Sequence, residues 1–143
     1  LRYDGTILAF AGLDRLGLHK EIAQTFALDI IPPDPAQGAI GITCHRESFV
    51  ARRFLQSINH GSSALEVAAE RALLRNLSEP DSLAIGAIAR TCNGRISLSA
   101  SLVSEDGANY WSCQDESALE HAEALGTRVG AALRKSALDL VSA

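Results

Sequence analysis

The sequence contains no methionine in its 143 residues, not even at its first position. A chain that begins at Leu1 is expected to be the later part of a longer protein. The opening stretch LRYDGTILAF carries an aspartate and offers no small-residue cleavage site, so we do not interpret it as a secretory signal peptide. We therefore expect the natural N-terminus to lie upstream of the given sequence.

Long apolar runs and concentrated positive charge are also missing. The longest apolar runs extend over only a few residues, which is too short to cross a bilayer. The net charge is −4, and the basic residues are scattered apart from the pairs Arg52–Arg53 and Arg134–Lys135. A nucleic-acid binder carries a concentrated basic stripe instead. We therefore expect neither a membrane nor a nucleic-acid partner.

Cysteine is scarce and widely spaced. The three cysteines are Cys44, Cys92 and Cys113, an odd number without any CxxC pair. This pattern supports neither a disulfide framework nor a metal site. Reduced thiols in a cytoplasmic protein are the simplest interpretation.

What is present is enough apolar content for a folded core, at 47%. The apolar run Ile7–Ala11 favours a buried strand, and a short helix that ends at Gly17 follows it. Three of the four prolines fall in IIPPDPAQG, so Pro32–Gly38 is expected to be an extended crossing segment or a turn. Ala39–His45 then favours another strand. These pieces cannot form a core by themselves, so we expect them to be fragments of two other α/β domains.

The pattern becomes helical from Glu47 onward. Val50, Phe54 and Ile58 recur every four residues and predict one apolar helical stripe. SSALEVAAERALLRNL predicts a second helix, in which Ser63 and Glu66 fit an S-x-x-E capping box. Its expected inward face consists of Leu65, Ala69, Ala72 and Leu73.

Three strands and a last helix complete the prediction. SLAIGAIART and RISLSASLVS are joined at Asn93-Gly94, a strong hairpin signal, and EDG joins the second strand to ANYWSCQ. Residues 116–140 predict a long helix. Its apolar stripe comprises Leu119, Ala122, Leu125, Val129 and Leu133. The expected fold class is α+β, with a three-stranded antiparallel sheet covered by helices on one face.

Six stretches together resemble the porphobilinogen deaminase (hydroxymethylbilane synthase) family. ILAFAGLDRLGL is similar to the family's AAGLxRLGL, and QGAIGITC to its GQGAxGIEC. INHGSSALEVAAERALL is similar to LNHxxTAxxxxAERAxL, while LVSEDG and HAEALG resemble VxxPDG and DAExxG. NLSEPDSLAIG completes the set, because its flanks match a family loop. The motifs follow in order from about Tyr3 to about Leu140.

The resemblance implies part of a three-domain cytoplasmic enzyme of haem biosynthesis. Such enzymes are transferases that condense four porphobilinogen molecules into hydroxymethylbilane with release of ammonia. They build the product on a dipyrromethane cofactor, which one cysteine holds as a thioether. We expect residues 1–28 to end domain two, 29–46 to cross into domain one, and 47–143 to form domain three. The expected partners are the pyrrole substrate and an N-terminal half that carries the catalytic aspartate.

The attachment loop departs from the family pattern L-E-G-G-C-x-x-P-I-G. Leu77, Ile85 and Gly86 match, but Asp81 stands at the position of the cysteine. A carboxylate cannot form a thioether, which needs a thiolate nucleophile. An ordinary turn is the alternative for this stretch, since EPD is typical turn chemistry. We therefore expect no covalently bound cofactor, and we assign neither a catalytic nor a metal-binding residue.

No other cysteine is a convincing replacement. Cys44 matches a cysteine of the family's GIEC strand and is expected to be a small buried residue. Cys92 adjoins the first hairpin turn, and Cys113 lies on the third strand.

Three further positions are candidates for cofactor binding by resemblance. Arg71 matches the family's AER arginine, whose planar guanidinium suits the carboxylates of cofactor and substrate. The alternative is an ordinary helical ion pair with Glu70 or another neighbour. Gln37 and Gly38 match the family's QG, although a hinge or turn after the prolines explains them equally well.

The function expected from these observations is that of the C-terminal portion of a porphobilinogen deaminase. The chain alone is expected to be inactive, because the catalytic half and the attachment thiol are absent from these residues. The alternative is a non-catalytic paralogue, or a module binding a small molecule or a protein, that keeps only the fold.

Overall fold

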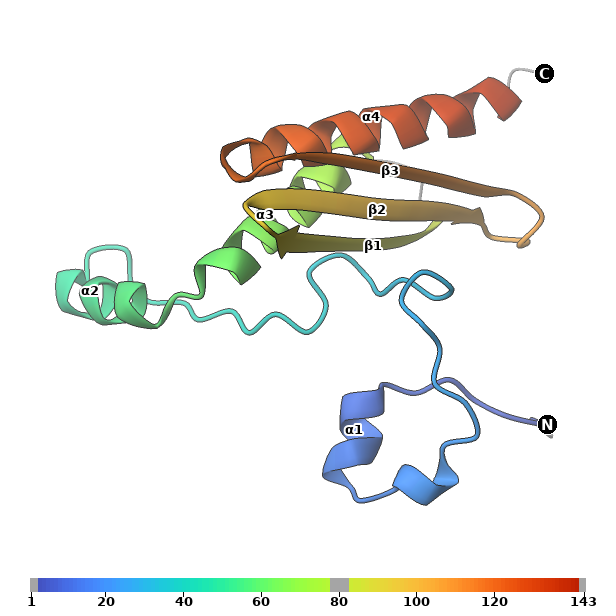
Figure 1. The fold of residues 1–143 in the computed structure, drawn as a ribbon, viewed down its shortest axis with the longest axis horizontal. Coiled ribbons are helices and arrows are strands. Elements are labelled where there is room, and N and C mark those ends of the chain that lie inside the picture. Colours follow the sequence, from blue (N-terminus) through green and yellow to red (C-terminus); the bar gives the residue numbers. More distant parts are fainter. Residues whose placement is uncertain (1–2, 78–82, 142–143) are drawn as a thin grey trace.

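The computed structural model describes residues 3–77 and 83–141 (Figure 1). Its elements, in chain order, are α1 (Phe10–Arg15), a 3₁₀ turn (His19–Glu21), α2 (Phe49–Ile58), α3 (Gly61–Asn76), β1 (Leu83–Cys92), β2 (Arg95–Ser104), β3 (Tyr110–Ala118), a second 3₁₀ turn (Leu119–His121) and α4 (Ala122–Val141).

The three strands form one antiparallel sheet in the order β1-β2-β3. Asn93 and Gly94 join β1 to β2 with φ angles of 49° and 74°, the left-handed values that a two-residue hairpin requires. Gly107, at φ 70°, lies in the turn between β2 and β3. Both predicted hairpins, and the α+β fold class, are therefore confirmed.

The core lies between the sheet and two helices. Helices α3 and α4 pack against each other and cover one face, α3 mainly over β1 and α4 mainly over β3 (Figure 1). Alternate residues of β2 point into this layer, which explains its two-residue period. The largest fully buried side chains are Leu73, Ile96, Leu98, Leu102, Leu125, Val129 and Leu133. The predicted inward faces of α3 and α4 are thus confirmed.

Glycine on α4 sets the distance between the two helices. A Cβ atom placed on Gly126 would lie 2.0 Å from the carbonyl oxygen of Ala69, and one on Gly130 would lie 2.9 Å from that of Leu73. Real Cβ atoms do not approach backbone this closely. The contact therefore requires glycine at both positions of α4, one helical turn apart.

Strand β1 is an edge strand, and three of its outward N–H groups are bonded. Ala87 N donates to Pro33 O at 2.9 Å, Ala89 N to Glu70 Oε1 at 2.7 Å and Thr91 N to Glu66 Oε1 at 2.8 Å. Unbonded edge groups invite pairing with other chains. Two side chains of α3 and the crossing segment remove that hazard here.

The region before α2 differs from the prediction. No strand is present within residues 3–46, so the predictions for Ile7–Ala11 and Ala39–His45 were wrong. Residues 7–9 and 39–45 have no regular secondary structure, Phe10 and Ala11 belong to α1, and neither segment finds a pairing strand among the described residues. The short helix before Gly17 is confirmed, since Gly17 (φ 70°) ends α1 through bonds from Gly17 N to Asp14 O and from Leu18 N to Leu13 O.

The apolar stripe predicted for α2 exists but is exposed. Val50, Phe54 and Ile58 are 64%, 70% and 64% accessible, and α2 lies away from the sheet (Figure 1). The helix itself is as predicted, apart from beginning at Phe49. Ser48 caps it by accepting a bond from Ala51 N at 3.4 Å.

Two local predictions were wrong for the same reason, which is that tertiary contacts replaced local ones. The expected capping box of α3 does not form, because the Glu66 carboxylate binds Thr91 and Ser63 Oγ bonds His60 Nδ1. The last helix begins at Ala122 rather than at Glu116, because β3 pairs with β2 as far as Ala118.

Among the described residues, no helix is both long and apolar enough to cross a membrane.

Replacing Gly126 with alanine is expected to destabilise the fold, since the new methyl group meets the Ala69 carbonyl. Overpacking of this kind lowers the free energy of unfolding by about 1–3 kcal/mol, against a helix-propensity gain of about 1 kcal/mol. Denaturant unfolding of Gly126→Ala and of the control Gly61→Ala measures it. The control methyl group would have no atom within 4 Å. Equal stability of the two variants would contradict the close contact.

Candidate cofactor-binding site

The crossing segment Pro32–Gly38 lies against β1 and α3. Besides the bond from Ala87 N to Pro33 O, Pro32 packs on Gly86 so closely that a Cβ atom there would lie 2.7 Å from Pro32 Cγ. Gly86 therefore has a packing reason to be glycine. The described structure confirms a crossing segment whose second half, residues 35–38, is a turn.

Glu70 joins this turn to the domain. The residue is only 8% exposed, and its two carboxylate oxygens accept from separate backbone groups. Oε2 accepts from Ala36 N at 2.6 Å, and Oε1 accepts from Ala89 N at 2.7 Å. A buried carboxylate needs such donors, because burial without them is costly. Glu70 is thus a bridge between α3, β1 and the crossing segment.

The three described candidates for cofactor binding are next in sequence to the residues of this bridge. Gln37 and Gly38 directly follow Ala36 in the turn, and Arg71 directly follows Glu70 on α3. The Gln37 side chain folds back on its own turn, where Oε1 accepts from Asp34 N at 3.3 Å. Gly38 has φ 85°, a value that favours glycine. The predicted turn role of both residues is therefore present.

Arg71 is exposed on α3, and no hydrogen bond or ion pair joins it to another described residue. Among the described residues it forms no ion pair with Glu70 or with another helical neighbour, and the oxygens of Glu70 accept from backbone N–H groups instead. An unpaired guanidinium is chemically suited to a carboxylate ligand.

Asp81, at the predicted attachment position, lies outside the described residues. The elements on either side are fixed: α3 ends at Asn76 with Leu77 buried, and β1 begins at Leu83. The loop thus starts from the helix that carries Glu70 and Arg71 and leads into the strand that the crossing segment contacts.

The cysteines are not gathered at this place. Cys44 is exposed, so its expected burial was wrong, and Cys92 is exposed at the end of β1. Cys113 is half-buried on β3, where burial and then the charge of Asp115 raise the pKa of its thiol. A raised pKa disfavours the thiolate that a thioether requires.

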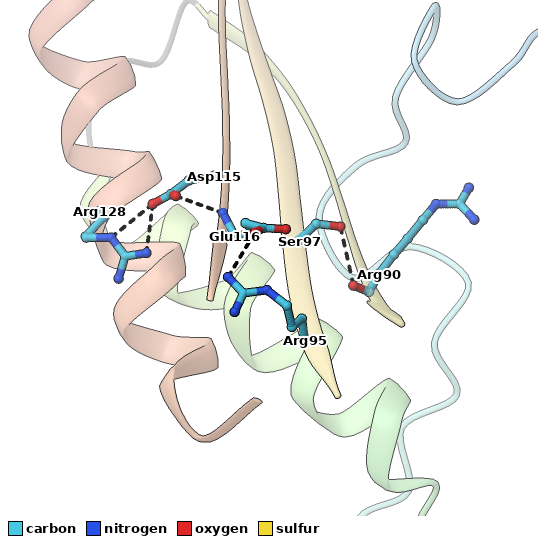
Figure 2. Close-up of polar contacts among 6 residues, drawn as sticks. All are labelled: Arg90, Arg95, Ser97, Asp115, Glu116 and Arg128. Carbon is cyan, nitrogen blue, oxygen red and sulfur yellow. Dashed lines mark hydrogen bonds and ion pairs between the residues drawn. The ribbon is translucent and has the colours of Figure 1, made fainter. Parts of the chain in front are cut away.

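A second group of polar contacts extends across the sheet from α4 (Figure 2). Arg128 of α4 donates from Nη2 and Nε to Asp115 Oδ2 on β3 at 2.7 and 3.0 Å, and Arg95 Nη2 on β2 contacts Glu116 Oε1 on β3 at 2.9 Å. The Arg128 bond, followed by the bond from Glu116 N, lowers the pKa of Asp115. Both acids are already paired: the first pair joins α4 to β3, and the second joins β2 to β3.

Other kinds of site receive no support. Within residues 3–77 and 83–141, no three His, Cys, Asp or Glu side chains are grouped to hold a metal ion. A shallow groove of about 290 Å³ lies between the end of α3 and α4. It is lined by Asn76, Ala131, Arg134, Lys135 and Leu138. None of the predicted cofactor-binding residues contributes to it.

Comparison with protein families decides the relationship. Residues 1–52 match the dipyromethane cofactor binding domain of porphobilinogen deaminase, and residues 64–135, half of the chain, match the porphobilinogen deaminase C-terminal domain. The chain belongs to the porphobilinogen deaminase family. It therefore contains the end of that family's cofactor-binding domain and residues of its C-terminal domain. The family consists of enzymes of tetrapyrrole biosynthesis that act on porphobilinogen.

The family matches do not test the predicted domain boundaries. The first match continues through the predicted boundary at residues 28–29 and past residue 46 into α2. The division into 1–28, 29–46 and 47–143 stays a prediction, as do the roles of individual residues.

Sequence reasoning assigned Glu66 to a capping box that does not form, and it missed the structural role of Glu70. The available signal was their spacing of four, which puts both carboxylates on one side of the helix beside its apolar stripe. The N–H groups that they bind could not be identified without the tertiary structure.

Asp115→Asn is expected to reduce stability by about 0.2–1 kcal/mol at pH 7, the range of exposed ion pairs. The folded pKa of Asp115 is lowered from 3.8, so its contribution is complete above the unfolded pKa and is lost as the pH falls through the folded one. Urea unfolding of both proteins from pH 7 to pH 2 should show the difference disappearing below pH 3.8. The exposed control Glu105→Gln should show no such difference, and a D115N difference that persisted at pH 2 would contradict the assignment.

Proposed function

We propose that the chain is the C-terminal portion of a hydroxymethylbilane synthase, and that it contributes a carboxylate-binding surface for the growing pyrrole chain. In the intact enzyme, this surface would face the rest of the cofactor-binding domain. The reaction joins porphobilinogen units, each of which carries two carboxylate side chains. Positively charged and N–H donors are what such a ligand needs.

The supporting observation is the attachment of the crossing segment to α3. Through Glu70, the Gln37–Gly38 turn is held to the helix position next to Arg71. Arg71 is exposed and unpaired among the described residues, so its guanidinium is available to bind one carboxylate in a bidentate manner. Gly38, exposed and without a side chain, permits close approach of a ligand to the backbone.

The residues do not fit a covalently attached cofactor. Asp81 occupies the attachment position, and neither Cys92 nor Cys113 lies in the loop that joins α3 to β1. We propose that any pyrrole ligand binds this chain without a thioether. The same departure favours the second candidate function, a non-catalytic relative that retains pyrrole binding. No catalytic step is assigned to residues of this chain.

Porphobilinogen binding tests the surface. Arg71→Ala is expected to weaken binding about tenfold or more, as for loss of a charge-assisted bond worth about 1.5–3 kcal/mol. Titration calorimetry on the chain measures it. Arg134→Ala, which removes an equally exposed cation from the groove beside α4, is the matched control and should bind like the wild type. Equal weakening by both variants would show only general charge attraction.

Activity and intact-mass measurements test whether this chain turns over porphobilinogen or holds a covalent primer. Incubation of the purified chain with porphobilinogen is expected to give no hydroxymethylbilane, measured as porphyrin absorbance after acid oxidation. Intact mass after incubation is expected to equal that of the polypeptide. Product formation, or an increment matching dipyrromethane, would refute the proposal that this chain neither turns over substrate nor holds a covalent primer.

A further inference from the structure

The carboxylate of Glu70 joins two separate parts of the chain, and no function has been given to this contact so far. Each of its oxygens serves one backbone donor, Ala36 N on the crossing segment and Ala89 N on β1. The donors are far apart in sequence, and the side chain between them is buried. The placement of the crossing segment therefore depends on an acceptor that the C-terminal domain supplies.

The residue that Glu70 holds has an unusual conformation. Ala36 has φ 65°, a left-handed value that a residue with a Cβ atom adopts only where its surroundings impose it. Ala36 O also accepts from Ala39 N at 3.3 Å, which closes the turn around Gln37 and Gly38. The direction in which those two residues face is consequently set at Ala36.

We propose that Glu70 is a positioning residue, which holds Ala36 in the left-handed conformation and so fixes the Gln37–Gly38 backbone against α3, the helix that carries Arg71. This inference rests on the proposed carboxylate-binding function of that surface. Glu70 does not bind the ligand itself, because its side chain is buried and a carboxylate repels the carboxylates of the ligand. Its effect on binding is transmitted through the turn.

Glu66 provides a matched control one helical turn away. Its Oε1 alone accepts both bonds, from Thr91 N at 2.8 Å and from Thr91 Oγ1 at 2.7 Å. Glutamine at position 66 retains a carbonyl oxygen and therefore keeps both bonds. Glutamine at position 70 keeps only one, because its NH₂ group would face the second N–H donor. The two variants remove the same charge from the same helix.

Amide hydrogen exchange, measured by NMR, tests the bond between Ala36 N–H and Glu70 directly. In the wild type, Ala36 N–H should exchange much more slowly than Gly38 N–H, which has no acceptor among the described residues. Glu70→Gln should accelerate exchange at Ala36 about tenfold or more, since bonds to a carboxylate are among the stronger ones. Glu66→Gln should leave Ala36 unchanged.

Two results would contradict the proposal that Glu70 holds Ala36. One is wild-type exchange at Ala36 as fast as at Gly38, a comparison that needs no variant and holds even if Glu70→Gln does not fold. The other is unchanged protection of Ala36 in a folded Glu70→Gln protein.

A second substitution that restores binding would separate a positioning role of Glu70 from an effect on overall stability. Glycine adopts φ 65° without strain, so adding Ala36→Gly to Glu70→Gln should recover part of the affinity for porphobilinogen that Glu70→Gln loses. Calorimetric titration should show that Glu70→Gln binds porphobilinogen about tenfold more weakly than the wild type. The double variant should recover part of this affinity, and Glu66→Gln should bind like the wild type. Wild-type affinity in Glu70→Gln, or no recovery, would refute the positioning role.

The failures of the two proposals are distinguishable. If the wild type does not bind porphobilinogen at all, the proposed function is refuted and the positioning role with it. The exchange rates at Ala36 would then still decide whether Glu70 holds the turn.

Discussion

The edge of β1 imposes the constraint on which the C-terminal domain depends. Its outward N–H groups must find acceptors, and Glu66 and Glu70 supply two of them, at Thr91 and Ala89. Four residues of helix rise about 6 Å, and two residues of strand advance about 6.6 Å, so the two spacings agree. The match holds α3 alongside β1 with opposite chain directions. Pro33 of the crossing segment supplies the third acceptor, at Ala87.

Much of this fold follows from local patterns in the sequence. The hairpin at Asn93-Gly94 and the buried stripe of α4 depend on nearest neighbours, and the structure confirms both. The errors arose where distant segments compete with local ones, as for Glu66, which binds Thr91 instead of capping its own helix. Strand formation at Ala39–His45 failed similarly, because hydrogen bonding in a strand requires a partner that no local pattern supplies.

The candidate site shows the same limit. Arg71, Gln37 and Gly38 were selected by resemblance, and the bond by which Glu70 ties their two segments together could be found only in the structure. The substitution at Asp81 was evident from the sequence, because the chemistry of a thioether depends on one atom type. In this chain the family's attachment chemistry is thus missing at position 81, while Arg71, Gln37 and Gly38 match the family motifs. Electrostatic recognition of carboxylates does not require the thiol.

The two bonds of Glu70 also differ in the length of chain that they span. The bond to Ala89 joins residues 19 apart in sequence, in neighbouring elements of the helix–sheet layer, whereas the bond to Ala36 joins residues 34 apart and reaches the crossing segment. One carboxylate therefore serves a short-range contact within the layer and a long-range contact to a separate segment. A change at Glu70 affects both contacts at once.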